Sequence, residues 1–121
     1  MGHRSRVCAV FFDTESSYEA SASFWSCALG RDLEFNADEK YTTLAGELEV
    51  IIQHARPGHQ GMHIDIETDN VEAEVVRLED LGAHKKYKIE DWWVLEAPGG
   101  HAFCVVPVYS DAWPAGATDW E

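Results

Sequence analysis

The strongest constraint on the fold is an internal repeat with a spacing of 52 residues. The segment FFDTESS at 11–17 matches HIDIETD at 63–69. Asp13 corresponds to Asp65, and Glu15 corresponds to Glu67. Further along, the Leu-Gly pair at 29–30 matches the Leu-Gly pair at 81–82. A repeat of this length indicates two copies of one supersecondary unit.

The second copy predicts an amphipathic helix after its first strand. Asp69 and Glu72 have the spacing of a capping box, and Gly82 can adopt the left-handed conformation that ends a helix. Apolar residues recur between them at three- and four-residue spacing, which predicts one buried face. This stripe consists of Val71, Val75, Leu78 and Leu81.

The first copy predicts a matching helix. Ser16 and Glu19 have the same capping-box spacing, and Gly30 supplies the same stop. The apolar stripe that we expect to face the core consists of Ala20, Phe24, Cys27 and Ala28.

Three short alternating runs follow each helix and predict strands. In the first copy, turn signals lie at Asn36 with Asp38 and at Gly46, and the second copy has Pro-Gly-Gly at 98–100. The predicted strands cover 32–36, 40–45 and 48–54, then 84–89, 92–97 and 101–106.

The sequence therefore predicts an α+β fold in which a βαβββ module occurs twice. We expect a single domain over 1–121, with module one at about 7–55 and module two at about 62–107. The tail at 108–121 lacks periodicity. It is either loose or docked through Trp113 and Trp120 onto the body or a partner.

Composition narrows the classes of partner. The formal net charge of -13, with no basic stripe, disfavours binding to nucleic acid. No apolar stretch is long enough to span a membrane, and the first twelve residues do not resemble a signal peptide. The three cysteines are widely spaced and odd in number, which favours reduced thiols in an acidic cytoplasmic protein.

Three segments in order resemble the vicinal oxygen chelate superfamily, which contains glyoxalases, bleomycin-resistance proteins and dioxygenases. They are FWSCALGRDLEF at 24–35, HIDIETDNVEAEVVRLEDLGA at 63–83 and WVLEAPGGHAFCVV at 93–106. The likeness covers about 7–107 and is closest to the compact glyoxalase-like members. It implies two modules whose curled sheets enclose a cup, and it implies a homodimer.

The resemblance also implies where a metal would bind. In metal-dependent members, four inward side chains from the first and last strands of each module, commonly His, Gln or Glu, hold a divalent ion. Other members bind a ligand without metal, so the fold alone does not decide the chemistry. His63 stands at a ligand position, but the repeat sets Phe11 opposite it, and Cys104 stands where the last-strand motif normally has glutamate.

Strand alternation predicts the faces of these strands. In the strand that begins near 62, Ile64 and Ile66 should pack under the helices, which leaves His63, Asp65 and Glu67 for the cup or its rim. In the fourth strand, Leu48, Val50 and Ile52 should face the helices, which leaves Glu49, Ile51 and Gln53 inward, with Ile51 as the counterpart of Cys104.

Other chemistry at these positions is less favoured. His63 beside Asp65 could act as a base, although such pairs are common on solvated strands. Cys104 lies among apolar residues in a negative field and is best interpreted as an inert thiol. His101 is interpreted as a turn or rim residue.

The favoured hypothesis is a glyoxalase-like protein with a degenerate metal site that binds a small aromatic or cationic molecule in the cup between the modules. No cofactor is expected. The alternative is a divalent-metal-dependent lyase, isomerase or dioxygenase that uses His63 with Cys104 and either Glu49 or Gln53. A third hypothesis is a protein-interaction module whose cup is filled by its own side chains. The candidate ligand-binding residues are His63, Phe11, Gln53, Glu49, Ile51, Trp93, Trp92 and Cys104.

Overall fold

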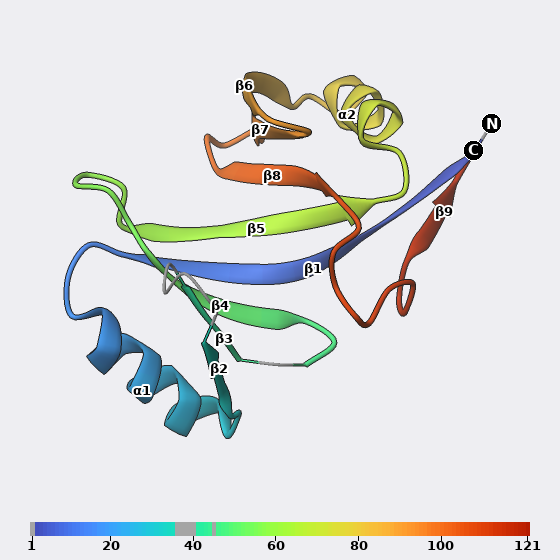
Figure 1. Ribbon diagram of the computed structural model, residues 1–121. Helices are drawn as coiled ribbons and strands as arrows, with labels where there is room; N and C mark the ends of the chain where they lie inside the picture. The colour runs from blue at the N-terminus through green and yellow to red at the C-terminus, as the bar shows by residue number, and fades with distance from the viewer. Residues whose placement is uncertain (1, 36–40, 45) are drawn as a thin grey trace. The chain divides into compact units, whose positions relative to one another are not determined.

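The computed structural model describes residues 2–35, 41–44 and 46–121 and contains the predicted βαβββ module twice (Figure 1). The α+β class and the doubled order are confirmed, while the expected turn at Asn36 and Asp38 lies outside the described residues. The first copy consists of β1 (His3–Thr14), α1 (Tyr18–Leu29), β2 (Leu33–Phe35), β3 (Tyr41–Leu44) and β4 (Glu49–His54). The second consists of β5 (Gly61–Thr68), α2 (Val71–Asp80), β6 (His84–Ile89), β7 (Trp92–Glu96) and β8 (Ala102–Pro107), and β9 (Thr118–Trp120) follows.

The chain divides into two compact units whose boundaries fall inside β1 and β5. The α1 unit is Ala9–His63, and the α2 unit is Met1–Cys8 together with Ile64–Glu121. The N-terminal part of β1 therefore belongs to the α2 unit, although the rest of the strand belongs to the α1 unit.

In the α1 unit, α1 packs on a sheet in which β1 is parallel to β4 and β2, β3 and β4 are antiparallel neighbours. Apolar residues on alternate positions of β4 face the helix, as predicted for Val50 and Ile52. Leu48, which was expected beside them, precedes the strand and is exposed. The core contains Ala22, Leu44, Val50 and Ile52, with Phe12, Tyr18, Trp25 and Leu33 packed against it.

The apolar stripe predicted to bury α1 against the core is exposed instead. Ala20, Phe24, Cys27 and Ala28 are all exposed, and the Phe24 side chain retains 61% of its accessible surface. Tyr18, Ala22 and Trp25 pack on the sheet instead, and the Trp25 ring stacks on Phe12 with centroids 4.3 Å apart. The helix has apolar residues on both sides, so periodicity alone could not select the buried one.

The start of α1 also differs from the prediction, and its end agrees. Ser17, in the left-handed conformation (φ 57°), is the N-cap and makes no side-chain capping bond, so the expected box of Ser16 and Glu19 is wrong. Gly30 ends the helix with φ 66°, as expected.

In the α2 unit, α2 packs on a sheet in which β5 is parallel to β8 and β8, β7 and β6 are antiparallel neighbours. The cap is Asn70, whose side chain accepts a hydrogen bond from the Ala73 amide, because Asp69 pairs with Arg4 instead. Leu81 was expected in the buried stripe, but it lies just past the helix and is 66% exposed. The core contains Val75, Ala83, Leu95, Phe103 and Val105, with Ile66, Val71, Leu78, Trp93 and Ala97 packed against it.

The C-terminal tail is docked, through both of its tryptophans. β9 pairs antiparallel with the start of β1, so the two ends of the chain lie together (Figure 1). The Trp120 indole donates to the Ser5 hydroxyl at 2.8 Å and covers the Arg77 guanidinium at 3.7 Å, while Arg4 lies 5.4 Å from the Trp113 ring.

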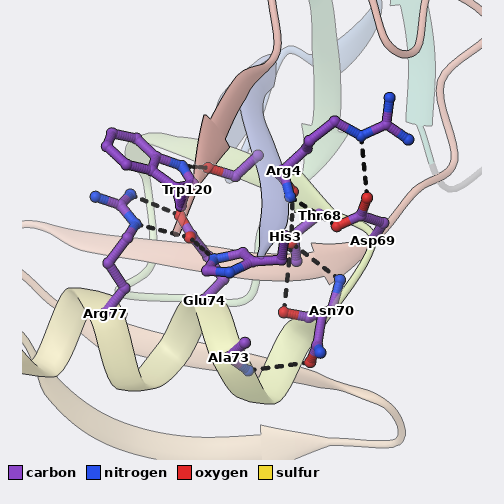
Figure 2. A network of polar contacts seen from close by, with 10 residues as sticks. His3, Arg4, Thr68, Asp69, Asn70, Ala73, Glu74, Arg77 and Trp120 are labelled. Atoms are coloured by element: carbon purple, nitrogen blue, oxygen red, sulfur yellow. Dashed lines mark hydrogen bonds and ion pairs between the residues drawn. The ribbon is translucent and has the colours of Figure 1, made fainter. Parts of the chain in front are cut away.

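A fully buried carboxylate joins these ends to α2 (Figure 2). Glu74 accepts two hydrogen bonds from Arg77 at 2.8 Å and lies 2.7 Å from the His3 imidazole. Burial alone would raise the pKa of Glu74. The hydrogen bonds from Arg77, and then from His3 and Ser5, outweigh burial and hold the pKa below its ordinary value of 4.5.

Two adjacent valines of α2 allow a matched test of the core. Val75 is fully buried and Val76 is 56% exposed. We expect Val75→Ala to lower the free energy of unfolding by about 2 kcal/mol, because it removes buried methyl groups and leaves a cavity. Val76→Ala should change it by less than about 0.5 kcal/mol. Urea denaturation of both variants measures the difference, and equal effects would contradict this assignment of the core.

Acid sensitivity tests the Glu74 network. Because the pKa of Glu74 is depressed in the fold, its stabilisation is present above pH 4.5 and is lost as the pH falls through the folded value. We expect Arg77→Met to cost about 2 kcal/mol at pH 7 and to flatten the loss of stability below pH 4.5. Arg56→Met, at an exposed arginine of the link, is the control. If Arg77→Met lost as much stability in acid as the wild type does, this role of the Glu74 network would be contradicted.

Candidate functional site

His63 is held between an aromatic ring and a carboxylate within the α1 unit. Its imidazole stacks on the Phe11 ring with centroids 4.4 Å apart and planes 12° from parallel. Its Nδ1 lies 2.5 Å from a carboxylate oxygen of Asp13. Phe11 and Asp13 are two residues apart on β1, so their side chains leave the strand on the same face. The imidazole, which is about 21% exposed, is therefore fixed in both position and orientation.

Asp13 is a site residue that the sequence did not identify. The sequence interpretation considered Asp65 as the carboxylate beside His63, because the two are close on one strand. The signal was nonetheless present. The repeat sets Phe11 opposite His63, and Asp13 is the next side chain on the face of β1 that Phe11 occupies.

The strand next to β1 supplies the other predicted residues of this face. In the parallel register, Phe11 pairs with Ile51 and Asp13 with Gln53. Val50 and Ile52 pack against α1, so Glu49, Ile51 and Gln53 lie on the opposite face, as alternation predicts. Ile51 is buried, whereas Glu49 and Gln53 are half-buried.

In the α2 unit, Asp65 and Glu67 are buried under the segment that follows β8. The Asp65 carboxylate accepts a hydrogen bond from the Tyr109 hydroxyl at 3.0 Å. Glu67 accepts bonds from the amides of Tyr109 and Ser110 at 3.0 Å and from the Ser110 hydroxyl, and Arg6 lies 3.4 Å away. A buried carboxylate is tolerated when such partners are present. Glu67 is therefore a structural residue that fixes the start of the tail.

The thiols of this unit differ in exposure. Cys104 is half-buried and is the register partner of Asp65. Next to Asp65 on β5, Ile64 is exposed, although it was expected to pack beneath the helices. Cys8 is completely buried, and this burial raises its pKa to about 12. Burial, and then the charge of Asp65, also raise the pKa of Tyr109. A buried thiol and phenol of this kind stay neutral at physiological pH.

The two adjacent tryptophans of β7 lie on different faces, as expected. Trp93 packs against the core beneath α2, and the ammonium of Lys85 lies 4.6 Å from its ring centroid. Among the described buried polar atoms, the Trp93 indole nitrogen alone has no hydrogen-bond partner. Trp92 is half-buried and by alternation lies on the face away from α2. His101 is exposed in the turn before β8.

Comparison with known families matches most of the chain. The sequence model of the glyoxalase-like domain family matches residues 9–106. The chain belongs to this family. Among curated proteins no significant match is found.

Solved structures with this fold share little sequence with the glyoxalase-like chain. A glyoxalase/bleomycin resistance protein/dioxygenase superfamily member from Vibrio splendidus is 18% identical, with a TM-score of 0.58 over 86% of this chain and 99% of that chain. An NAD-dependent benzaldehyde dehydrogenase from Legionella pneumophila is 12% identical, with a TM-score of 0.64 over 83% of this chain and 98% of that chain.

A third similar structure carries a ligand. It is a methylmalonyl-CoA epimerase variant from Streptomyces coelicolor in complex with 2-nitronate-propionyl-CoA. It is 13% identical, with a TM-score of 0.55 over 85% of this chain and 94% of that chain. At these identities the comparisons establish the fold alone.

Donor side chains occupy only some of the positions at which the resemblance implies metal ligands. In the α1 unit, the register pair Phe11 and Ile51 on the first and last strands of the module presents no donor atom. In the α2 unit, Cys104 and Asp65 offer one soft and one hard donor.

Thiol alkylation tests the burial of Cys8 in this glyoxalase-like protein. In dilute native protein at pH 8, we expect N-ethylmaleimide to modify the exposed Cys27 at least about a hundred times faster than Cys8, because only the thiolate reacts. Mass spectrometry of tryptic peptides measures both rates, and all three thiols should react in guanidinium chloride. Equal native rates for Cys8 and Cys27 would contradict the assigned burial.

Proposed function

We propose that this glyoxalase-like protein binds a small organic molecule with His63 as its polar anchor and does so without the divalent metal of the family. The observation that carries the proposal is the fixed imidazole, stacked on Phe11 and bonded to Asp13. An ionised carboxylate can only accept, so the His63 Nδ1 carries the proton and the tautomer is set. Pre-organisation of this kind lowers the cost of ordering a binding group.

The surroundings of His63 in the α1 unit favour one chemical class of ligand. Phe11 and Ile51 are apolar, while Asp13, Glu49 and Gln53 supply a few polar groups on the same strand faces. Such a mixture is typical of small-molecule sites. Two carboxylates beside an aromatic ring, in a chain of net charge -13, favour a cationic or aromatic molecule. The complex of the similar epimerase with a coenzyme A derivative supports small-molecule binding by this fold.

A metal-dependent lyase, isomerase or dioxygenase is the second candidate. The contact between Nδ1 and Asp13 favours it, because histidines that bind a metal usually donate their other ring nitrogen to a carboxylate or carbonyl. In this second candidate, His63, Cys104 and Glu49 would be the metal ligands. The poor fit of Phe11 and Ile51 to ligand positions makes it the less favoured function.

Metal content separates the two functions. For protein purified without an affinity tag, we expect elemental analysis to find less than about 0.1 equivalent of zinc, nickel, manganese or iron, because the register pair Phe11 and Ile51 offers no donor atom. About one equivalent of any of these metals, lost on His63→Ala and kept on His59→Ala, would overturn the metal-free proposal in favour of the second candidate. His59 is exposed and lies in the link before β5, so it is a suitable control.

Ligand binding is tested by thermal shift with aromatic and cationic probes such as tryptamine and benzamidine. We expect at least one probe to raise the melting temperature of the wild-type protein and of His59→Ala but not of His63→Ala. Asp13→Asn should weaken binding by about tenfold, because the imidazole loses its charged partner, whereas Glu19→Gln on α1 should not. The absence of stabilisation by every probe, or an unchanged response of His63→Ala, would contradict the proposal.

A further inference from the structure

The inward face of β5 and β8, which is the face away from α2, is open at one end and closed at the other. Along β5, His63 is half-buried, Asp65 retains 6% of its accessible surface and Glu67 retains none. On β8, Cys104, the register partner of Asp65, is half-buried. Val106, the register partner of Glu67, is buried. Because α2 packs on the opposite face, another part of the chain covers the Glu67 end.

The start of the tail is the part that covers this end. The Tyr109 hydroxyl donates to the Asp65 carboxylate at 3.0 Å. The amides of Tyr109 and Ser110 each donate to Glu67 at 3.0 Å, and the buried Ser110 hydroxyl donates to it as well. The apolar cluster beneath α2 lies within residues 66–105. The start of the tail therefore covers the inward face instead of extending this cluster.

The tail is an addition to the domain that the family shares. The family model matches residues 9–106, and β8, the last strand of the second module, ends at Pro107. Both βαβββ modules are thus complete before the tail begins. A segment outside the modules that binds side chains of their inward face can limit what this face binds.

Tyr109 stands at the boundary between the open and closed ends. Asp65, to which it donates, is the next side chain after His63 on the inward face of β5. Tyr109 retains 45% of its accessible surface, so solvent reaches the side chain although its hydroxyl is bound. Given the proposed function, on which this inference rests, we propose that Tyr109 determines the specificity of the binding site, because it covers Asp65 and withholds this carboxylate from a ligand at His63.

The cover predicts the charge of the preferred ligand. An ammonium group that paired with Asp65 would first have to displace the Tyr109 hydroxyl. One that paired with Glu67 would have to displace the three donors of the tail. The favoured ligand is therefore an aromatic molecule with a single positive charge, and removal of the cover should favour one with two.

Modification of Cys104 tests the cover without any ligand. A carboxylate oxygen of Asp65 lies within 4.8 Å of the Cys104 sulfur, so an uncovered Asp65 would attract a cationic reagent and repel an anionic one. The reagents are methanethiosulfonates that carry a trimethylammonium or a sulfonate group. We expect Tyr109→Ala to raise the ratio of the cationic to the anionic rate at Cys104 by at least about fivefold. Mass spectrometry of peptides measures both rates, and their ratio cancels any change in the thiolate fraction.

Three comparisons make this result specific. The ratio at the exposed Cys27 should stay unchanged. Tyr87→Ala, at a tyrosine with a similar exposure of 49%, should leave the Cys104 ratio unchanged. Adding Asp65→Asn to Tyr109→Ala should abolish the increase. Circular dichroism verifies folding, and Tyr109→Ser, which removes the ring and keeps a polar side chain, replaces Tyr109→Ala if that variant does not fold. An unchanged Cys104 ratio without the tyrosine, or an equal rise in Tyr87→Ala, would overturn the proposal.

Calorimetry distinguishes this inference from the proposed function. Benzylamine has one positive charge and 1,4-bis(aminomethyl)benzene has two. At about 150 mM salt, we expect Tyr109→Ala to bind the diamine at least about tenfold more tightly than the wild type does, and benzylamine within about threefold of it. A raised Cys104 ratio with unchanged diamine affinity would overturn selection by Tyr109 alone. Failure of both compounds to bind either protein would overturn the proposed function together with this selection, even where the Cys104 ratio shows that the cover exists.

Discussion

Each module of this protein has a single helix, and one helix can cover only one face of a strand pair. In β4 this constraint buries Val50 and Ile52 under α1, and in β8 it buries Phe103 and Val105 under α2. The opposite faces of these strands are not covered by a helix of their own module. Chemistry-bearing side chains of both copies therefore occur at alternate positions of the parallel pairs β1–β4 and β5–β8.

The acids of the second copy have different roles from those of the first. Glu67 accepts hydrogen bonds from backbone amides and a hydroxyl at the start of the tail. Glu74 on α2 is paired with Arg77 and His3. Both buried carboxylates fasten segments near the chain ends, because leaving either unpaired would be costly. The matching acid of the first copy, Glu15, is exposed and accepts a hydrogen bond from the Gly58 amide. The repeat thus preserved the strand pattern while the roles of its acids diverged.

Hydrophobic periodicity and the internal repeat were sufficient to predict the fold, because both are properties of the sequence itself. The two modules, the strand positions and the faces of Val50, Ile52 and Ile66 followed from them. Details decided by tertiary contact did not follow. The face of α1 was selected by the large Trp25 ring, Asp69 was drawn from the helix cap by Arg4, and the partners of Glu67 come from a segment without periodicity. Asp13 was within reach of the repeat argument, but its contact with His63 depends on the exact placement of two side chains.

The central claim is that Asp13 and Phe11 fix His63 as the anchor of a metal-free binding site. Long-range proton–nitrogen NMR of the histidine rings, with the His63 signals assigned by loss in His63→Ala, observes this imidazole directly. The account predicts a ring that carries a proton on Nδ1, with signals that stay unchanged when a chelator is added and shift when an organic ligand binds. A ring without a proton on Nδ1, or signals that move on chelation and return with zinc, would contradict it.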